Sequence, residues 1–560
     1  MPRVAVIGAG VSGLRCAGLL ARSQCKVTVY EARNRVGGRV HQDLNDGHMV
    51  DMGSNWIHGT EGNPMTRLAR KTGTIVWTPD ERSLVVDENG VRRSEEESGE
   101  LSEEFWAQVV QAFKYADQNS VEIPSSKSLK DFLKQAWVKR YPKEAQKVRD
   151  LLNESAVWGQ FVGGRVETQS LKFFWLEECL EGENVFVAST YHKILKYIAD
   201  PVVNDPTGNL KLRLSSEVTR IQYRSSDQQR EVAVTTSDGQ SETFDEVVVT
   251  CPLGWLKHNK EHVFEPKLPA RLSDAIDNIG YGALEKLYIS FSEPWWMSKS
   301  RGADETPADS LPDSPASMLL DQFSVSSASS TSGSDTTYPP ITSFHSPNYH
   351  TIPESQGSLS FNQSVISLAH LPCSTNHATL LFYVTGDASR YLTTALSQHI
   401  PHSPESTALI SAFAAPFLSR LPNHDPGNLV CRPTSYLATS WSLDPYAGFG
   451  SYSNFPVGLE HADEDIECMR ASGGLGVDGK GLWLAGEHTA PFVALGTTTG
   501  AYWSGEGVSR QICRRHGIEM VEDEFSSSGG GREAAGDVGG ATRGSERKAD
   551  DGRLGKALNA

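Results

Sequence analysis

Three glycines and one glutamate near the start of the chain have the types and spacing that bind a dinucleotide. Gly8, Gly10 and Gly13 follow an apolar run at residues 4–7 and precede a stretch with helical spacing. In that order the glycines form a tight turn at a helix N-terminus, where free N–H groups and the helix dipole hold a pyrophosphate. Glu31 ends the next predicted strand, where its carboxylate can accept the ribose 2′-hydroxyl. A lone glycine motif is often only a turn, but here it has the strand–helix–strand–acid order that dinucleotide binding requires.

A second glycine pair follows the acidic residue. Arg33 lies two residues after Glu31, and the tripeptide Gly37-Gly38-Arg39 comes next. The glycine pair offers two more N–H donors and Arg39 offers a fixed cation, which together suit a second contact with phosphates. Enzymes that use nicotinamide dinucleotides do not need this addition. The extended pattern resembles the FAD-binding start of the flavin amine oxidases.

The last third of the chain carries another glycine-rich motif. A buried strand is predicted at residues 481–485, followed by Glu487 and by a glycine-rich helix start at residues 496–505. The carboxylate suits a ribityl hydroxyl, and the helix N-terminus can stabilise negative charge near the N1/O2 edge of a reduced isoalloxazine. Because both ends of the chain would then hold one cofactor, we expect a cofactor domain built from discontinuous segments.

Four further motifs complete the pattern. They are the loop 53–59 with His58, the segment 250–257, the segment 441–446 with Trp441 and Tyr446, and the segment 450–458 with Tyr452. A lone loop histidine is more often a packing residue than a catalytic one. Together with the glycine motifs, however, the chain resembles the flavin-containing amine oxidases from residue 3 to about residue 518, apart from a serine-rich insertion. Within that family it is most similar to the polyamine oxidases.

The resemblance implies that FAD is the cofactor. No cysteine or histidine lies at residues 496–505, where monoamine oxidases carry their flavin-linking cysteine, so we expect non-covalent binding. The residues that match the family's FAD contacts are Gly8, Gly10, Gly13, Glu31, Arg39, Val218, Glu487 and Thr498. Neighbouring motif positions add the candidates Arg33, Gly38, Trp441, Tyr446 and Thr497.

The resemblance also implies three catalytic residues. Lys286 matches the lysine that holds a water against flavin N5, His58 matches an active-site histidine of animal and yeast enzymes, and Tyr452 matches one wall of an aromatic cage beside the flavin. The opposite wall is tyrosine in plant polyamine oxidases and monoamine oxidases, but the matching position here is Thr497. The cage is therefore expected to have one wall, which leaves room for a longer substrate.

Two points stay open from the residues alone. Lys286 lies in an alternating strand, where a lysine usually guards a sheet edge. If it is buried instead, desolvation lowers its pKa and makes it a usable water-positioning base. The family's substrate-binding carboxylates have no clear match. The candidates by composition are Glu177, Glu178, Glu181 and Glu183, for which solvated helix residues are the simpler interpretation.

Composition excludes several other functions. A net charge of −17 argues against nucleic acid as a partner. The chain has no apolar run of roughly eighteen residues, and it begins with a strand next to Met1, so we expect neither a membrane span nor a signal peptide. Its eight cysteines are scattered without a C-x-x-C motif, which predicts reduced thiols and no metal site. We therefore expect a cytoplasmic protein with small-molecule partners and leave the oligomeric state open.

The predicted fold is a two-domain α/β flavin amine oxidase fold. A Rossmann-like FAD-binding domain combines residues 1–76, 190–268 and 436–520, and a mixed α/β substrate domain combines residues 77–189 and 269–435. The Ser/Pro-rich insertion 298–358 and the tail 521–560 are predicted to be disordered. Within the domains we predict helices at 101–116 and 129–138, a β-meander at 210–250, strands at 284–291 and 379–385, and a solvated acidic loop and helix start at 95–104.

The resemblance predicts an FAD-dependent oxidase of spermine, spermidine or their N-acetylated forms. Hydride transfer to flavin N5 would give an aldehyde and a shorter amine, and dioxygen would yield hydrogen peroxide. A histone demethylase is an alternative, but the chain lacks the helical SWIRM-type module and the long antiparallel tower of those enzymes. An amino-acid or monoamine oxidase needs a carboxylate clamp or a two-walled cage, and neither is seen. A non-catalytic flavoprotein is disfavoured because Lys286 and Tyr452 are present.

Overall fold

The N-terminal glycine motif belongs to a five-stranded parallel sheet. The computed structural model describes residues 1–80, 82–223, 231–297, 338–350, 362–372, 374–471 and 481–526. The sheet order is β21-β12-β1-β2-β8, with every neighbouring pair parallel. The strands are β1 (Arg3–Ile7), β2 (Lys26–Tyr30), β8 (Leu210–Arg213), β12 (Glu246–Val249) and β21 (Leu482–Leu484). They come from the start, middle and end of the chain, which confirms a Rossmann-like domain with a discontinuous sequence.

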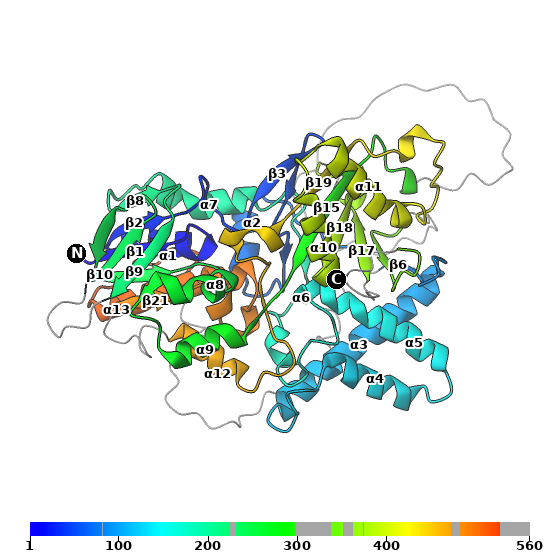
Figure 1. Cartoon of the computed structure of the whole chain (residues 1–560), viewed down its shortest axis with the longest axis horizontal. Coiled ribbons are helices and arrows are strands. Elements are labelled where there is room, and N and C mark those ends of the chain that lie inside the picture. Colours follow the sequence, from blue (N-terminus) through cyan, green and yellow to red (C-terminus); the bar gives the residue numbers. More distant parts are fainter. Residues whose placement is uncertain are drawn as a thin grey trace, which may run out of the picture.

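Both faces of this sheet are buried. Val4 and Val6 of β1 share a core with the helices α1 (Val11–Arg22), α7 (His192–Val203) and α13 (Thr498–Arg515). Ala5 and Ile7 point the other way, toward a four-stranded sheet of order β11-β10-β9-β13 (Figure 1). Its strands are β9 (Val218–Tyr223), β10 (Val232–Thr236), β11 (Ser241–Phe244) and β13 (Phe264–Glu265). Burial on both faces explains the continuous apolar runs at residues 4–7 of β1 and 247–249 of β12.

The predicted β-meander at residues 210–250 is wrong in part. The strands β9, β10 and β11 are antiparallel neighbours, but β8 and β12 belong to the parallel sheet. All four residues of β12 are buried, whereas a meander strand with one solvated face would bury alternate residues. The unbroken apolar run at residues 247–249 is therefore the signal that separates β12 from the meander.

The other half of the molecule is built on a six-stranded, mainly antiparallel sheet of order β19-β15-β18-β17-β16-β6 (Figure 1). Its strands are β6 (Ser83–Val86), β15 (Leu284–Ser290), β16 (Ile341–Phe344), β17 (Gln363–Ser367), β18 (Thr379–Thr385) and β19 (Ser435–Ala438). Leu287 and Phe382 of this sheet share a core with α10 (Gly386–Leu396) and α11 (Pro404–Leu418). The strands β15 and β18 confirm the predicted strands at 284–291 and 379–385.

Three helices form a separate layer beside this sheet (Figure 1). They are α3 (Glu95–Asn119), α4 (Leu129–Arg140) and α5 (Ala145–Glu154), and they share one core. Both predicted helices are confirmed. The acidic run is exposed and begins a helix as predicted, but it contains no loop, because Ser94 caps α3 and accepts a hydrogen bond of 3.1 Å from the Glu97 N–H. Acidic side chains in a first turn are stabilised by the helix dipole.

Both predicted disordered segments are partly ordered. Within the insertion, residues 298–337 and 351–358 lie outside the described residues, but β16 takes its place in the six-stranded sheet. In the tail, residues 527–560 lie outside the described residues, but Asp523 accepts a hydrogen bond of 2.6 Å from Arg15 of α1 and Phe525 is buried. A few apolar and charged side chains with partners outside their own segment are enough to order these residues. The average composition of a segment does not reveal such side chains.

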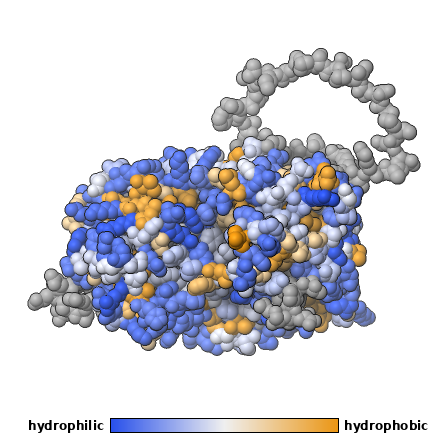
Figure 2. Space-filling view, turned by 45° about the horizontal axis from the view of Figure 1, so that its top comes forward, coloured by the Kyte–Doolittle hydropathy of each residue, from blue (hydrophilic) through white to orange (hydrophobic). Residues whose placement is uncertain are grey.

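The remaining helices and strands are mostly short. They are β3 (Gln42–Asn45), β4 (His48–Asp51), β5 (Trp56–Ile57), β7 (Val185–Phe186), β14 (Gly280–Tyr281), β20 (Ser453–Asn454), α2 (Pro64–Thr72), α6 (Gly159–Val162), α8 (Leu253–Val263), α9 (Ala270–Asn278) and α12 (Ala462–Arg470). Within the described ranges, no helix combines the length and the apolar character needed to cross a bilayer. The face drawn in Figure 2 is mainly hydrophilic, with hydrophobic groups in small separate patches.

Candidate cofactor and active site

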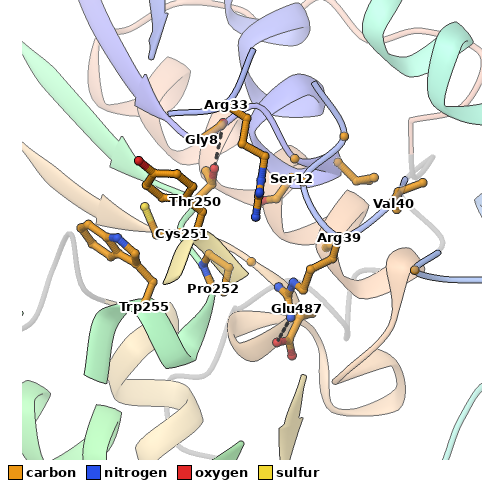
Figure 3. A pocket seen from close by; sticks show the side chains of 18 of the residues that line it. Gly8, Ser12, Arg33, Arg39, Val40, Thr250, Cys251, Pro252, Trp255 and Glu487 are labelled. Carbon is orange, nitrogen blue, oxygen red and sulfur yellow. Dashed lines mark hydrogen bonds and ion pairs between the residues drawn. The ribbon is translucent and has the colours of Figure 1, made fainter. Parts of the chain in front are cut away.

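A deep cavity opens at the carboxyl ends of β1, β2 and β12 (Figure 3). It encloses about 1340 Å³ together with its mouth. Gly8 follows β1, Glu31 follows β2 and Thr250 follows β12, and the cavity continues from there to Tyr452 and Thr497. Ligands of open parallel sheets bind at this edge. The fold thus brings the N-terminal and C-terminal motifs to one elongated site.

The glycine turn at one end of the cavity leaves room for a phosphate. Gly8 has a φ of +103°, and a Cβ on Gly13 would lie 2.0 Å from the Gly8 carbonyl oxygen, so α1 packs closely on the turn. Gly10 caps α1 and faces open space, which a side chain there would fill. No acidic residue lies in the first turn of α1. An anion therefore meets free N–H groups and the positive end of the helix dipole.

Glu31 is held in place beside this turn. Its carboxylate accepts hydrogen bonds from the backbone N–H of Ala9 at 2.8 Å and of Arg33 at 2.9 Å. The side chain of Arg33 donates two bonds to Asp444, at 2.7 and 2.8 Å, and lies over the Tyr446 ring. Glu31 is thus fixed where a ribose hydroxyl would reach it, and Arg33 and Tyr446 form one wall of the same end.

The middle of the cavity is closed by an ion pair between Arg39 and Glu487 (Figure 3). The Arg39 guanidinium donates to Glu487 at 3.0 Å and to the Ser451 carbonyl at 2.6 Å. Burial alone would raise the pKa of Glu487, but Arg39, His488 and a hydrogen bond from Ser453 hold it below the usual value. The carboxylate is therefore ionised, as an acceptor of ribityl hydroxyls must be.

These residues fit FAD. The cavity offers a phosphate cradle at one end, hydrogen-bond acceptors along its length and the N-terminus of α13 at the other end. The predicted cofactor residues that line it are Gly8, Gly10, Glu31, Arg33, Gly38, Arg39, Val218, Trp441, Tyr446, Glu487, Thr497 and Thr498. Gly13 lies behind the lining, where it allows α1 to approach the turn.

The far end of the cavity carries Tyr452 opposite the start of α13. The Tyr452 hydroxyl donates to the Phe161 carbonyl at 2.9 Å, which fixes the ring. Thr497 accepts the Gly500 N–H at 2.9 Å and donates to the Ala494 carbonyl at 2.7 Å, so its hydroxyl caps α13. This end of the cavity is thus lined by one aromatic side chain, Tyr452, and one small side chain, Thr497.

Lys286 lies behind the cavity lining and is almost fully buried. Its Nζ donates to the carbonyl of Asp51 at 3.2 Å and to the carbonyl of Gly53, and Gly53 lines the cavity. Burial lowers the pKa of Lys286 to about 7, against the attraction of Asp51. The strand β15 is flanked by β18 and β19, so the edge-guard interpretation is wrong. A lysine that is partly neutral near pH 7 can exchange a proton with a bound water.

His58 is not among the residues that line the cavity. Its ring is hydrogen-bonded to the Asn184 side chain, and burial lowers the pKa of the imidazole. The neighbouring Gly59 N–H also donates to Asn184, at 3.1 Å. His58 is therefore a neutral side chain in the packed contact between the 53–59 loop and residues 180–184. Its place in the active site stays a prediction.

Glu177 is the candidate carboxylate that the structure places near Tyr452. The Glu177 oxygen Oε1 is buried and has no hydrogen-bond partner among the described residues. Burial raises the pKa of Glu177 to about 8, although Phe455 and Gln169 donate hydrogen bonds to it. The solvated interpretation is thus wrong for Glu177, whereas Glu181 and Glu183 are exposed as it predicts.

Several lining residues were not assigned a role from the sequence, although most of them lie in the motif segments 250–257 and 450–458. They include Ser12, Thr250, Cys251, Pro252, Trp255 and Ser451. Thr250 donates to the Gly8 carbonyl at 3.0 Å and ties the two strand ends together (Figure 3). Assigning β12 to the parallel sheet would have placed the segment after it at the cavity, because the carboxyl ends of parallel strands meet at one edge.

Comparisons with known proteins agree with this geometry. The model of the family "Flavin containing amine oxidoreductase" matches residues 11–513. Polyamine oxidase 4 of Oryza sativa subsp. japonica is 31% identical over 310 residues, which is 53% of this chain and 60% of that protein. A lysine-specific histone demethylase 1B homolog of Caenorhabditis elegans is 28% identical over 53% of this chain and 37% of that protein. The chain therefore spans about 60% or less of the length of these two relatives.

A solved structure shares the fold. It is a putrescine oxidase double mutant redesigned in its cofactor binding, and it superposes with a TM-score of 0.60. The match covers 92% of this chain and 99% of that one at 16% sequence identity. This likeness confirms the two-domain architecture described above.

Proposed function

The chain belongs to the family of flavin-containing amine oxidoreductases and is an FAD-dependent amine oxidase, and we propose that the amine it oxidises is a polyamine. The overall reaction would combine one amine, one dioxygen and one water to give one aldehyde, one shorter amine and one hydrogen peroxide. Bound FAD supplies the two-electron acceptor for the C–N bond that is oxidised. The protein's own residues bind the amine, orient it and hold its remaining charges.

The observation that carries the proposal is the buried carboxylate of Glu177. A carboxylate with an unpartnered buried oxygen is costly unless a cation or donor reaches it. Burial raises the pKa of Tyr452, and the charge of Glu177 raises it further, so the two groups interact electrostatically. An ammonium bound between them would pair with the carboxylate and lie against the aromatic ring. A polyamine has such an ammonium beyond its reacting nitrogen, and a simple monoamine has none.

The combination of one aromatic residue, Tyr452, and one small residue, Thr497, at the far end of the cavity supports the same proposal. One aromatic wall orients a chain without closing around it, so a long flexible substrate can extend past the flavin edge. The reacting nitrogen must be neutral to be oxidised, whereas the distal nitrogens stay protonated. Each distal ammonium paired with a carboxylate at an effective dielectric of about 20 gains on the order of a few kcal/mol before desolvation.

The experiment is a substrate panel with peroxide detection and mass spectrometry of the products. We expect kcat/KM for spermine or acetylspermine to exceed that for benzylamine by roughly a thousand, because about 1.4 kcal/mol corresponds to tenfold. Raising the salt concentration should increase KM for spermine more than it lowers kcat, since screening acts on the distal charges. Comparable kcat/KM values for the two amines would refute the polyamine assignment.

Variants of the acidic segment test the role of Glu177. Glu177→Gln should raise KM for spermine by about tenfold or more and leave that for benzylamine nearly unchanged. The matched control is Glu181→Gln, which removes one exposed carboxylate of the same segment. Because histone demethylases are also relatives, the panel includes a methyl-lysine peptide, and turnover of that peptide above spermine would favour the demethylase class.

A further inference from the structure

The buried Lys286 is anchored by a residue that no motif singled out. Asp51 ends β4 and is 3% exposed, as is Lys286 on β15. The Asp51 backbone carbonyl accepts a hydrogen bond of 3.2 Å from Lys286 Nζ, and it also accepts one of 2.6 Å from the Tyr288 hydroxyl. The Asp51 carbonyl thus contacts two polar side chains of β15, Lys286 and Tyr288.

The carboxylate of Asp51 is fixed in a second direction. Both of its oxygens lie 3.1 Å from the backbone nitrogen of Tyr191, just before α7, and the side chain of Gln42 donates to it at 2.7 Å. No bond in this set depends on Lys286. These bonds therefore fix the position of the buried carboxylate beside the lysine.

We propose that Asp51 is a positioning residue for Lys286: its carbonyl holds the amine nitrogen beside the cofactor cavity, and its buried carboxylate controls whether that nitrogen carries a proton. The inference rests on the proposed role of Lys286 at the flavin edge. It extends that role from one lysine to a buried acid–base pair.

Other groups around Lys286 do not supply this control. The Tyr383 ring of β18 has its centroid 5.9 Å from Nζ, and the phenols of Tyr288 and Tyr191 interact electrostatically with Asp51. Burial raises the pKa of each of these three phenols, so they stay neutral near pH 7. Glu285 points to the other side of β15, where it accepts hydrogen bonds from the Trp441 and Ser442 N–H groups. Asp51 is thus the charged neighbour that acts on Lys286 within the described chain.

The pair is balanced near neutral pH. Burial raises the pKa of Asp51 to about 7 while Lys286 opposes the shift, and burial lowers the pKa of Lys286 to about 7 while Asp51 opposes that shift. Each charge therefore favours the ionised form of the other. Removing the carboxylate should lower the pKa of Lys286 further, so that the lysine loses its proton at a lower pH.

The experiment measures reoxidation of the dithionite-reduced holoenzyme by dioxygen between about pH 5.5 and 9. It uses no amine, so it gives a result even if the polyamine assignment fails. The bound flavin's visible spectrum is titrated over the same range as a readout without turnover. We expect an inflection near neutral pH in the wild type, which Lys286→Met abolishes and Asp51→Asn moves to lower pH by on the order of one unit.

Two further variants make the test specific. Tyr288→Phe removes a hydrogen bond to the same carbonyl but no charge, so the inflection should stay in place although the rate changes. Gln42→Leu removes one donor to the Asp51 carboxylate, so less of it is ionised and the inflection should move down by a smaller amount. If Asp51→Asn gives no folded holoenzyme, Gln42→Leu decides alone. An inflection that Asp51→Asn and Gln42→Leu both leave in place, or one that survives Lys286→Met, overturns the proposal.

Discussion

Arg39 and Glu487 form an ion pair of 3.0 Å although 448 positions separate them in the chain. Arg39 belongs to the glycine-rich segment after β2, and Glu487 directly follows the β21 region. The pair crosses the middle of the cofactor cavity, and both partners line it. It therefore couples the first and last segments of the cofactor domain at the place where the cofactor binds.

Replacing Arg39 should weaken FAD binding. In Arg39→Met the Glu487 carboxylate stays buried without its cation, and the cavity loses a charged donor. A charged hydrogen bond contributes about 1.5–3 kcal/mol, so we expect the dissociation constant of FAD to rise by roughly 10- to 100-fold. Flavin fluorescence on titration of apoprotein measures it. Arg3→Met, which removes a half-exposed pair with Glu231, is the control and should change the constant by less than about twofold.

FAD should be bound without a covalent bond. The cavity lining around the start of α13 consists of glycine, threonine and alanine, and the cysteine that lines the cavity, Cys251, lies next to the strand ends at the Glu31 side. Burial raises the pKa of the Cys251 thiol, which keeps it protonated and unreactive. Acid precipitation should release all the yellow colour into the supernatant. Flavin left on the washed pellet would contradict the expectation.

Lys286→Met should keep FAD bound and slow turnover. The side chain lies behind the lining, so its loss should remove no cofactor contact, but it removes the amine that is held beside the cofactor cavity, where we expect the flavin edge. A positioned proton donor or cation at developing charge typically contributes about 100- to 1000-fold in rate. Stopped-flow measurement gives the rates of the reductive and oxidative half-reactions separately. Unchanged rates in both would assign Lys286 a structural role.

The same lysine should make stability depend on pH. Its pKa is about 7 in the folded protein and about 10.4 in an unfolded chain. Between these values the unfolded state binds more protons, so the unfolding free energy of the wild type rises with pH, by at most about 1.36 kcal/mol per unit from this group. Denaturant unfolding of apoprotein at several pH values from about 8 to 10 should show a shallower rise in Lys286→Met. Parallel slopes for the two proteins would contradict the buried, partly neutral lysine.

The close packing of α1 on the glycine turn gives a steric prediction. A Cβ at Gly13 would lie 2.0 Å from the Gly8 carbonyl oxygen, so Gly13→Ala should move α1, cost about 1–3 kcal/mol and weaken FAD binding. Gly99 is the matched control because it also lies in a helix, α3, and a Cβ added there would meet no described atom within 4 Å. Gly99→Ala should raise stability by up to about 1 kcal/mol. Equal melting temperatures for the two variants would rule out the clash.

The cofactor end of the site could be predicted from the sequence because its signals are local. A glycine turn, an acid at the end of the next strand and an arginine after a glycine pair each describe their own surroundings, as Gly10, Glu31 and Arg39 show. The discontinuous domain followed from the same motifs, since one cofactor must touch both ends of the chain.

The substrate end could not be predicted in the same way. Asp51 contacts Lys286 although 235 positions separate them in the chain. No sequence motif around either residue indicates this contact. Glu177 looked like its exposed neighbours in composition, and only packing around Phe455 and Gln169 makes it different. His58 matched a motif, but the motif does not reveal its hydrogen bond to Asn184. Burial and pairing decide these roles, and both depend on tertiary contacts.

The order of strands in the parallel sheet has a consequence for synthesis on the ribosome. The sheet's first two strands emerge early, but β21 and Glu487 follow about 450 residues later. At about 5–20 residues per second, that interval lasts on the order of half a minute or more. Throughout this time the segment with the glycine turn and Arg39 lacks Glu487, the ion-pair partner of Arg39, and the sheet lacks its edge strand β21. The nascent chain cannot hold its cofactor until β21 and Glu487 have been synthesised. Added FAD should therefore stabilise the completed polypeptide and not the nascent chain.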